Sequence, residues 1–358
     1  MRHTTRIPVV LIGNVLEPLD KASGGMERST LELARILSER PEVRLTLITN
    51  SGTETMRNIQ MIRCRPVVEC PSDYVLHGDG ISKWQHIAND AAILEALLSL
   101  DEIGVVHDQS SSVSACVLAS RKACSTLKTL RLLPSHPGCR LTVGRRAWTV
   151  YISRFQQQMD GWNSPGQSSV IYDFVPYTCS DVRKDVGRVL SVGRVEHRKG
   201  HDIAARVAAA MGKQLHVIGK LKDEPFAKSL ADNHIVIRGE MEPASLMREI
   251  TNSEALIWTP RTPEPGGRVV VEALKCGVPV YAVRAGIAAD IIDAGNTSRI
   301  TPCLRVSGID LFRLDELPKF MNFDRNFVAE SHIALYRMLF DDRQPKDENS
   351  SLTIRSTG

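Results

Sequence analysis

Apolar runs of strand length alternate with helical periodicities along the first part of the chain. The run at 7–15 (IPVVLIGNV) is branched and almost continuously apolar, which predicts a buried strand. A Gly-Gly loop follows, and residues 26–40 (MERSTLELARILSER) then place apolar side chains at helical spacing. The run at 43–50 (VRLTLITN) predicts a second strand. The order strand, Gly-rich loop, helix and strand is a βαβ unit, so we expect a parallel sheet.

Two later runs, at 103–110 (IGVVHDQS) and 129–136 (TLRLLPSH), are apolar and then become polar. Each predicts a buried strand with polar residues at its carboxyl end, where ligand groups gather in an open α/β sheet.

The same alternation starts again after Pro176, which predicts a second α/β domain. Its expected strands are 187–195, 213–219, 234–239, 254–260 and 278–283. Its expected helices are 202–212, 243–253 and 268–276. Near the end, 325–342 has the pattern of one amphipathic helix, and the polar tail after it is typical of disorder.

We therefore predict two Rossmann-like, doubly wound α/β domains that face each other across a cleft. The predicted boundaries are 1–180 for an acceptor-side domain and 181–325 for a ligand-binding domain. Residues 326–345 would form a helix that packs back on the first domain, and 346–358 a disordered tail. The cleft between the domains is the expected site.

The composition fits a protein of this kind. The chain has 358 residues, of which 42% are hydrophobic and 24% charged, as in soluble globular proteins with two domains. A net charge of +4 is too small to indicate a nucleic-acid module. The eight cysteines form no C-x-x-C pair, and the first residues do not form a signal peptide. We expect reduced thiols in a cytoplasmic protein, with peripheral contact to a membrane left open.

The stretch that carries the most chemistry lies between the strand at 254–260 and the strand at 278–283. Gly266 and Gly267 let the backbone approach a ligand closely, and the helix that follows points its first N–H groups at the loop. Glu264 lies beside that helix N-terminus and Glu272 lies less than two turns along it. Carboxylates and N–H groups together suit a polyhydroxylated ligand. Solvated surface acids would leave the same pattern.

Residues 264–280 (EPGGRVVVEALKCGVPV) resemble the E-x7-E signature of retaining GT-B glycosyltransferases of family four, also called glycosyltransferase group 1. The pattern departs at Gly266, where the family usually has an aromatic or other large residue. Residues 189–202 (VLSVGRVEHRKGHD) resemble the family's G-R-x4-K-G segment. Residues 23–37 resemble its G-G-x-E-R helix start, and His107 and His136 stand at two strand ends as in the family.

The resemblance implies a GT-B fold and a set of site residues. The implied catalytic residues are Arg194, Lys199, Glu264 and His136. The implied residues that bind the nucleotide-sugar donor are Gly24, Gly25, Gly193, Met241, Gly266, Gly267, Arg268 and Glu272. Within this set, Glu272 would accept from the ribose hydroxyls, and Glu264 with the adjacent N–H groups would bind hydroxyls of the sugar. The base would lie near 239–241.

Arg194 and Lys199 also fit a diphosphate on physical grounds, since Arg can bind it bidentately and Lys adds a point charge. No D-x-D pair occurs to hold a divalent ion on the diphosphate, so we expect no metal and no resident cofactor. The family uses UDP-, GDP- and ADP-sugars, and a UDP-sugar is the favoured donor. The acceptor would be a small molecule, a glycan or a lipid-linked molecule.

Two other functions remain open at this point. A sugar-nucleotide epimerase shares the two-domain fold. A non-catalytic binder of nucleic acid or an anionic surface could use 109–159, which has eight cations, among them Arg140, Arg145 and Arg146, and no acid. Few aromatic residues are interleaved there, so we do not expect nucleic acid as the partner. An anionic acceptor, or one at an anionic membrane, would also explain these cations.

Overall fold

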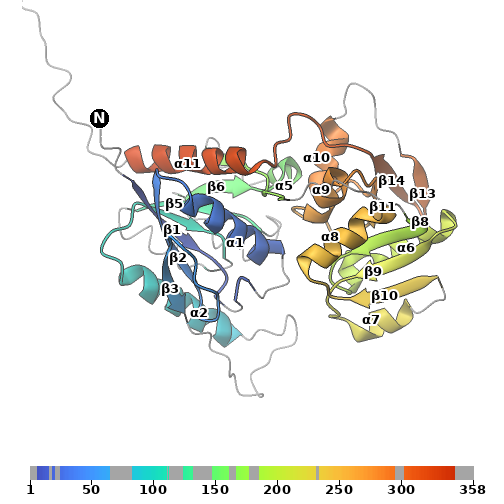
Figure 1. The fold of residues 1–358 in the computed structure, drawn as a ribbon, viewed down its shortest axis with the longest axis horizontal. Coiled ribbons are helices and arrows are strands. Elements are labelled where there is room, and N and C mark those ends of the chain that lie inside the picture. The colour runs from blue at the N-terminus through green and yellow to red at the C-terminus, as the bar shows by residue number, and fades with distance from the viewer. Residues whose placement is uncertain are drawn as a thin grey trace, which may run out of the picture.

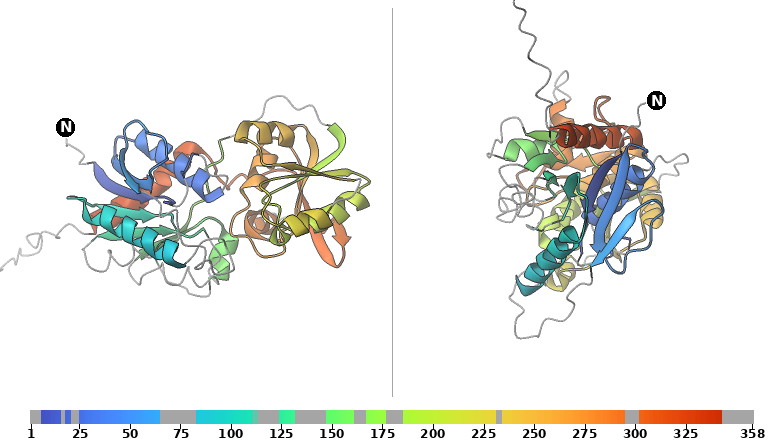
Figure 2. Two further views of the ribbon diagram at one scale, coloured as in Figure 1. Left: turned by 90° about the horizontal axis from the view of Figure 1, so that it is seen from below. Right: turned by 90° about the vertical axis from the view of Figure 1, so that its left-hand side faces the viewer.

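The computed structural model describes residues 6–15, 18–20, 25–64, 83–110, 112, 124–131, 147–160, 167–176, 185–230, 234–294 and 302–342. Within these ranges the chain forms two lobes, each built on a sheet with helices on both faces (Figures 1 and 2).

The N-terminal sheet is parallel in every pair of strands and has the order β3-β2-β1-β4-β5-β6-β7. Its strands are β1 (Ile7–Ile12), β2 (Val43–Asn50), β3 (Gln60–Cys64), β4 (Val105–Asp108), β5 (Ser125–Thr129), β6 (Ala147–Tyr151) and β7 (Ser168–Val170). The helices of this lobe are α1 (Gly25–Ser38), α2 (Lys83–Leu98), α5 (Arg154–Met159) and α11 (Arg325–Asp341).

Strand β1 shows why this sheet needs helices on both faces. Val9 and Leu11 pack into one core cluster with residues of α1 and α11. Val10 and Ile12, whose side chains point the other way, pack into a second cluster with residues of α2. A continuously apolar strand is therefore buried on both sides, as its sequence predicts.

The C-terminal sheet has the order β10-β9-β8-β11-β12-β14-β13. Its strands are β8 (Asp185–Val192), β9 (Gln214–Ile218), β10 (Ile235–Gly239), β11 (Ser253–Trp258), β12 (Val280–Ala282), β13 (Leu304–Val306) and β14 (Ile309–Leu314). Its helices are α6 (His201–Ala210), α7 (Glu224–Ser229), α8 (Pro243–Thr251), α9 (Arg268–Lys275) and α10 (Gly286–Ala294). Helices α6 and α7 pack on one face and α8, α9 and α10 on the other.

The two doubly wound α/β domains are confirmed, with differences in detail. The strand expected at 129–136 is found earlier, as β5, and ends at Thr129, while 132–136 lie outside the described residues. The antiparallel hairpin of β13 and β14 extends the second sheet beyond the expected parallel strands. It was not predicted because its two short strands lack a continuous apolar run.

Helix α11 follows the second domain in the sequence but lies against the first (Figure 1). The hydroxyl of Ser125 donates to the Leu339 carbonyl oxygen at 2.7 Å, and Tyr336 bonds to His107 at 2.7 Å. Tyr336 is fully buried there. The junction expected at residue 180 and the tail expected at 346–358 lie outside the described residues.

The sequence led us to expect reduced thiols, and for one cysteine this expectation is wrong. Cys64, Cys124 and Cys303 are free, whereas Cys276 is disulfide-bonded. Of the helices in the described ranges, none is both long enough and apolar enough to cross a bilayer.

Candidate functional site

A cavity of about 1030 Å³ lies between the two domains and contains most of the residues that the sequence singles out. Those that line it are Gly25, Gly193, Arg194, Lys199, Met241, Glu264, Gly266, Gly267, Arg268 and Glu272. Two expected site residues, Gly24 and His136, lie outside the described residues. The cavity wall on the N-terminal side comes mainly from α1, together with Arg131, Ile152 and Asp173.

Lys199 and Glu264 meet in this cavity although they are far apart in the chain. The Lys199 ammonium donates to Glu264 Oε1 at 2.6 Å, and both side chains are half-buried. Lys199 ends a short 3₁₀ turn (His197–Lys199), after which Gly200 adopts a φ of 68°. A Cβ on Gly200 would lie 1.8 Å from the Thr259 carbonyl oxygen. Only glycine therefore lets the turn approach the end of β11 closely enough to bring the two charges together.

Arg194 reaches the cavity from the end of β8 and keeps more freedom. Its side chain is 46% exposed and its guanidinium contacts Glu196 at 3.2 Å. Its carbonyl oxygen bonds to His201 Nε2 at 3.0 Å, and His201 Nδ1 bonds to the Ser191 hydroxyl at 2.8 Å. Burial lowers the pKa of His201. Nothing in the local sequence marks this histidine, whose two hydrogen bonds fix the backbone at Arg194.

The loop at 264–267 is anchored from behind by α10. Ile287 N–H donates to the Gly266 carbonyl oxygen at 2.8 Å. Gly286 has a φ of 48°, and a Cβ there would lie 1.9 Å from that same oxygen. On the cavity side, a Cβ on Gly266 would come within 3.2 Å of Ile152 Cδ1. Ile152 thus occupies space beside the position where the resembling family usually carries a large side chain.

Glu272 lies at the cavity wall but is only 2% exposed. Arg268, one turn before it in α9, contacts its Oε1 at 2.9 Å, and Arg28 of α1 contacts the same oxygen at 3.3 Å. The Arg268 side chain continues past Glu272 into the other domain, where it pairs with Glu32. The expected ribose-binding carboxylate is therefore held by two arginines, one from each domain.

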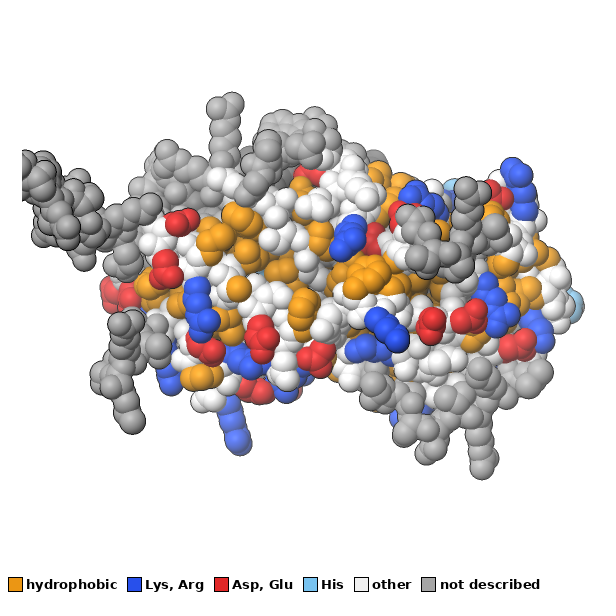
Figure 3. Space-filling view, turned by 90° about the horizontal axis from the view of Figure 1, so that it is seen from above, with side chains coloured by type: hydrophobic (Ala, Val, Ile, Leu, Met, Phe, Trp, Pro, Cys, Tyr) orange, Lys and Arg blue, Asp and Glu red, His pale blue; other side chains and the backbone are white. Residues whose placement is uncertain are grey.

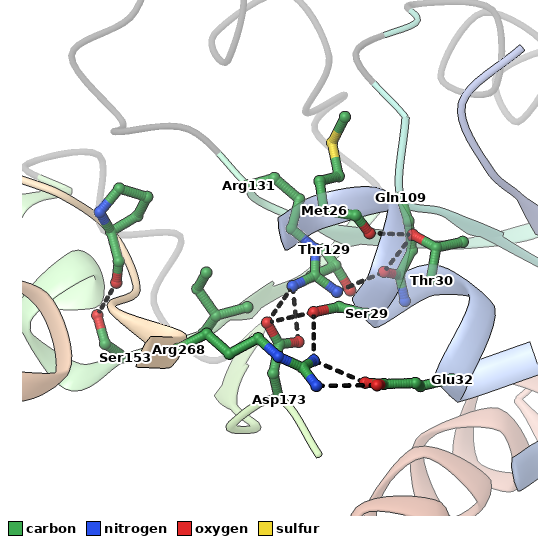
Figure 4. A network of polar contacts seen from close by, with 12 residues as sticks. Met26, Ser29, Thr30, Glu32, Gln109, Thr129, Arg131, Ser153, Asp173 and Arg268 are labelled. Atoms are coloured by element: carbon green, nitrogen blue, oxygen red, sulfur yellow. Dashed lines mark hydrogen bonds and ion pairs between the residues drawn. The ribbon is translucent and has the colours of Figure 1, made fainter. Parts of the chain in front are cut away.

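A polar network continues from Arg268 into the N-terminal domain (Figure 4). Arg131 binds both oxygens of Asp173, at 2.6 and 2.5 Å, and the Ser29 hydroxyl donates to the same carboxylate at 3.0 Å. Burial by itself would raise the pKa of Asp173, but the charge and hydrogen bonds of Arg131 outweigh burial and lower it. Asp173 is therefore an anion at neutral pH. Neither Arg131 nor Asp173 was predicted from the sequence as part of the site.

Residues 109–159, which we call the basic segment, are partly neutralised by acidic residues from elsewhere in the fold. Lys128 is buried with Asp108 at 2.6 Å, and Arg131 is bound to Asp173. On the face drawn in Figure 3, cations and anions are interspersed over both lobes. Arg140, Arg145 and Arg146 lie outside the described residues, so their expected contact with an acceptor stays a prediction.

His107, the other strand-end histidine, is fully buried. Its Nε2 bonds to Thr129 at 2.7 Å and its ring stacks on His332. Burial lowers its pKa well below the usual range. His107 is therefore a neutral packing residue. Among the described residues, no group of three His, Cys, Asp or Glu side chains could hold a metal ion.

Comparison with known proteins gives one family and many similar structures. Residues 180–304, about a third of the chain, match the family model described as Glycosyl transferases group 1. No curated protein sequence matches the chain. The structure of AviGT4, a glycosyltransferase involved in avilamycin A biosynthesis, is similar with a TM-score of 0.67 at 18% identity, covering 94% of this chain and 98% of that one.

Two further structures are similar over comparable lengths. A glycosyltransferase from Rickettsia africae ESF-5 gives a TM-score of 0.63 at 16% identity, covering 94% of this chain and 99% of that one. Alr3699/HepE from Anabaena, in complex with UDP and glucose, gives a TM-score of 0.61 at 16% identity, covering 94% of this chain and 96% of that one. At these identities the likeness establishes the fold, which is the two-domain GT-B fold.

Proposed function

We propose that this chain is a glycosyltransferase that uses a nucleotide-sugar donor, because residues 180–304 match the model of glycosyl transferases group 1 and the chain has a GT-B fold. We further propose that it retains the configuration at the anomeric carbon, needs no metal ion, and favours a UDP-sugar. The observation that carries the proposal is the ion pair of Lys199 with Glu264 in the interdomain cavity, with Arg194 beside it on the cavity wall.

In the proposed reaction, the bond between the sugar's C1 and the diphosphate oxygen breaks, and its electron pair stays on the diphosphate. An acceptor hydroxyl oxygen forms the new bond to C1, and its proton passes to the leaving diphosphate or to water. The chain would hold the acceptor hydroxyl close to C1 of the donor sugar and stabilise the charge that builds on the leaving diphosphate.

Lys199 and Arg194 supply that positive charge. Both line the cavity, and Arg194 is exposed enough for its guanidinium to turn from Glu196 toward a phosphate. Glu264 neutralises the Lys199 ammonium within the cavity, and a diphosphate would replace Glu264 as the partner of Lys199. Glu264 would then accept hydrogen bonds from hydroxyls of the transferred sugar, together with N–H groups at the start of α9.

The nucleoside would lie along the C-terminal wall. Glu272 would accept a hydrogen bond from the ribose, and the base would lie against Glu240, Met241 and Pro243, which line the same cavity. The acceptor would enter from the N-terminal side, between α1 and the Arg131–Asp173 pair. We propose a hydroxylated acceptor such as a glycan or lipid-linked sugar. HepE, a fold relative, binds UDP and UDP-glucose in its own structures.

A thermal-shift panel of UDP, GDP and ADP tests the proposal first. A nucleoside diphosphate at ten times its dissociation constant should add about 1.4 kcal/mol to stability. Transfer is then assayed with the corresponding sugar nucleotides and hydroxylated acceptors. Stabilisation by none of the three nucleotides would contradict the proposed function. Release of an epimerised sugar without transfer would identify an epimerase instead.

A further inference from the structure

Helices α1 and α9 carry the same arginine-to-glutamate spacing. Arg28 and Glu32 lie four apart on α1, and Arg268 and Glu272 lie four apart on α9. Residues four apart in a helix share one face. All four side chains line the interdomain cavity, so the two helices present their charged faces to each other.

The two pairs are joined crosswise between the domains. Arg268 binds Glu32 through both terminal nitrogens, at 2.6 and 2.8 Å, and Arg28 binds Glu272 at 3.3 Å. Arg268 Nε also contacts Glu272 at 2.9 Å. Figure 4 shows Arg268 extended between the domains toward Glu32 and Ser29. Arg268 therefore touches both glutamates, one in each domain.

These charges are largely removed from water. Burial raises the pKa of Glu32, although Arg268 and Arg28 offset part of that shift. Burial would lower the pKa of Arg268, but its bonds to Glu32 and Glu272 outweigh burial and raise it. Two cations and two anions make the quartet neutral. Separating the domains would leave each glutamate without its arginine from the other helix, so the quartet favours one relative placement of α1 and α9.

Glu272 uses its two oxygens differently. Both arginines bind Oε1, and none of the described residues donates a hydrogen bond to Oε2. This leaves Oε2 as the oxygen that can accept from a ligand in the cavity. The orientation of Glu272 therefore depends on Arg28 directly and on Glu32 through Arg268.

We infer that Arg28 and Glu32 of α1 are positioning residues of the sugar-donor site, which hold the two domains closed and orient Glu272 toward the nucleotide ribose. This inference rests on the proposed function. Nucleotide binding and domain closure would then be coupled, because the same four side chains stabilise the closed arrangement and orient Glu272.

The test uses the full chain with Glu32→Gln and Arg28→Gln, each nearly isosteric or shorter and uncharged. The matched control is Glu102→Gln, which breaks the exposed Arg44–Glu102 pair inside the N-terminal domain. UDP affinity is measured by calorimetry, and the radius of gyration by X-ray scattering with and without saturating UDP. Steady-state transfer then separates KM for the sugar donor from kcat.

Both α1 variants should raise the Kd of UDP and the KM for the sugar donor roughly 5- to 30-fold, with a smaller change of kcat. Without UDP they should be more expanded than the wild type, and saturating UDP should restore its dimensions. The control should match the wild type throughout. Wild-type values of Kd, KM and radius of gyration in both folded variants would overturn the inference. A wild-type chain that binds none of UDP, GDP and ADP would overturn the proposed function, and this coupling with it.

Discussion

Lys199 and Glu264, 65 positions apart in the sequence, form a 2.6 Å ion pair inside the interdomain cavity. One comes from the turn after β8 and the other from the loop after β11, the two central and adjacent strands of the second sheet. Their contact brings together the G-R-x4-K-G and E-x7-E segments of the sequence.

Replacing Lys199 by Ala should lower transfer roughly 10- to 100-fold, because a hydrogen bond to a charged group contributes about 1.5 to 3 kcal/mol. Arg194→Ala should act in the same direction. Lys213→Ala is a matched control, since Lys213 is equally buried and pairs with Glu254 at 2.8 Å outside the cavity. Initial rates at fixed sugar-donor concentration measure the effect. Wild-type transfer rates in Lys199→Ala would contradict the proposed role of this lysine on the diphosphate.

Gly286→Ala should weaken nucleotide binding and destabilise the second domain by about 1 to 3 kcal/mol. Its positive φ disfavours a side chain, and the added Cβ would press on the Gly266 carbonyl oxygen and shift the loop at 264–267. Gly212→Ala is the control, because Gly212 has a φ of 66° and open space around it. Thermal unfolding measures the loss of stability in each variant, and UDP affinity measures the effect on the loop. Equal UDP affinity in both variants would mean that the loop does not depend on Gly286.

Transfer should persist in excess EDTA, since the proposal assigns the diphosphate to Arg194 and Lys199. The measurement compares initial rates before and after chelation, then after addition of Mg²⁺ or Mn²⁺. Complete loss that only a divalent ion restores would show that a metal holds the diphosphate, and the roles given to the two cations would be wrong.

Acid should destabilise the N-terminal domain through His332. Burial lowers the pKa of His332 to about 4 from its usual 6.5. Between these values the unfolded chain binds a proton that the folded chain does not, so the free energy of unfolding falls as pH drops from about 6.5 to 4. The share of this histidine in the loss of unfolding free energy is on the order of 2 to 3 kcal/mol between pH 7.5 and 4.5.

His332→Gln cannot titrate and should lose less stability over that interval than the wild type. Urea unfolding followed by circular dichroism at the two pH values measures the difference. Part of the acid effect should remain, because burial also lowers the pKa of His107, which stacks on His332. Identical pH dependence in variant and wild type would contradict the assignment.

Elements with strong local patterns were predictable from the sequence. The apolar run of β1 and the helical spacing of α1 determine those elements wherever the rest of the chain lies. Glu264 and Lys199 were predicted to lie at a ligand cleft because each stands at a strand end with glycines beside it, and both line the interdomain cavity, while their roles there stay a prediction. Their contact was not predictable, since it depends on the backbone approach at Gly200.

The parts that sequence could not give are those set by tertiary contacts. Asp173 and Arg131 lie in separate segments, and nothing local marks them as partners. Arg268 was expected to bind the sugar donor, and no local pattern indicated that its side chain also extends to Glu32 in the other domain. The basic segment looked unbalanced because Asp108 and Asp173, which neutralise part of it, lie outside its range.

Helix α11 places the last described turns of the chain inside the core of the first domain. Tyr336 and Ile333 complete the same apolar cluster as β1 and α1. During synthesis, the first domain therefore leaves the ribosome with part of its core missing and must wait for the whole second domain to be translated. Loss of α11 through premature termination would damage the domain that is made first, and an N-terminal fragment expressed alone would expose the apolar face that this helix covers.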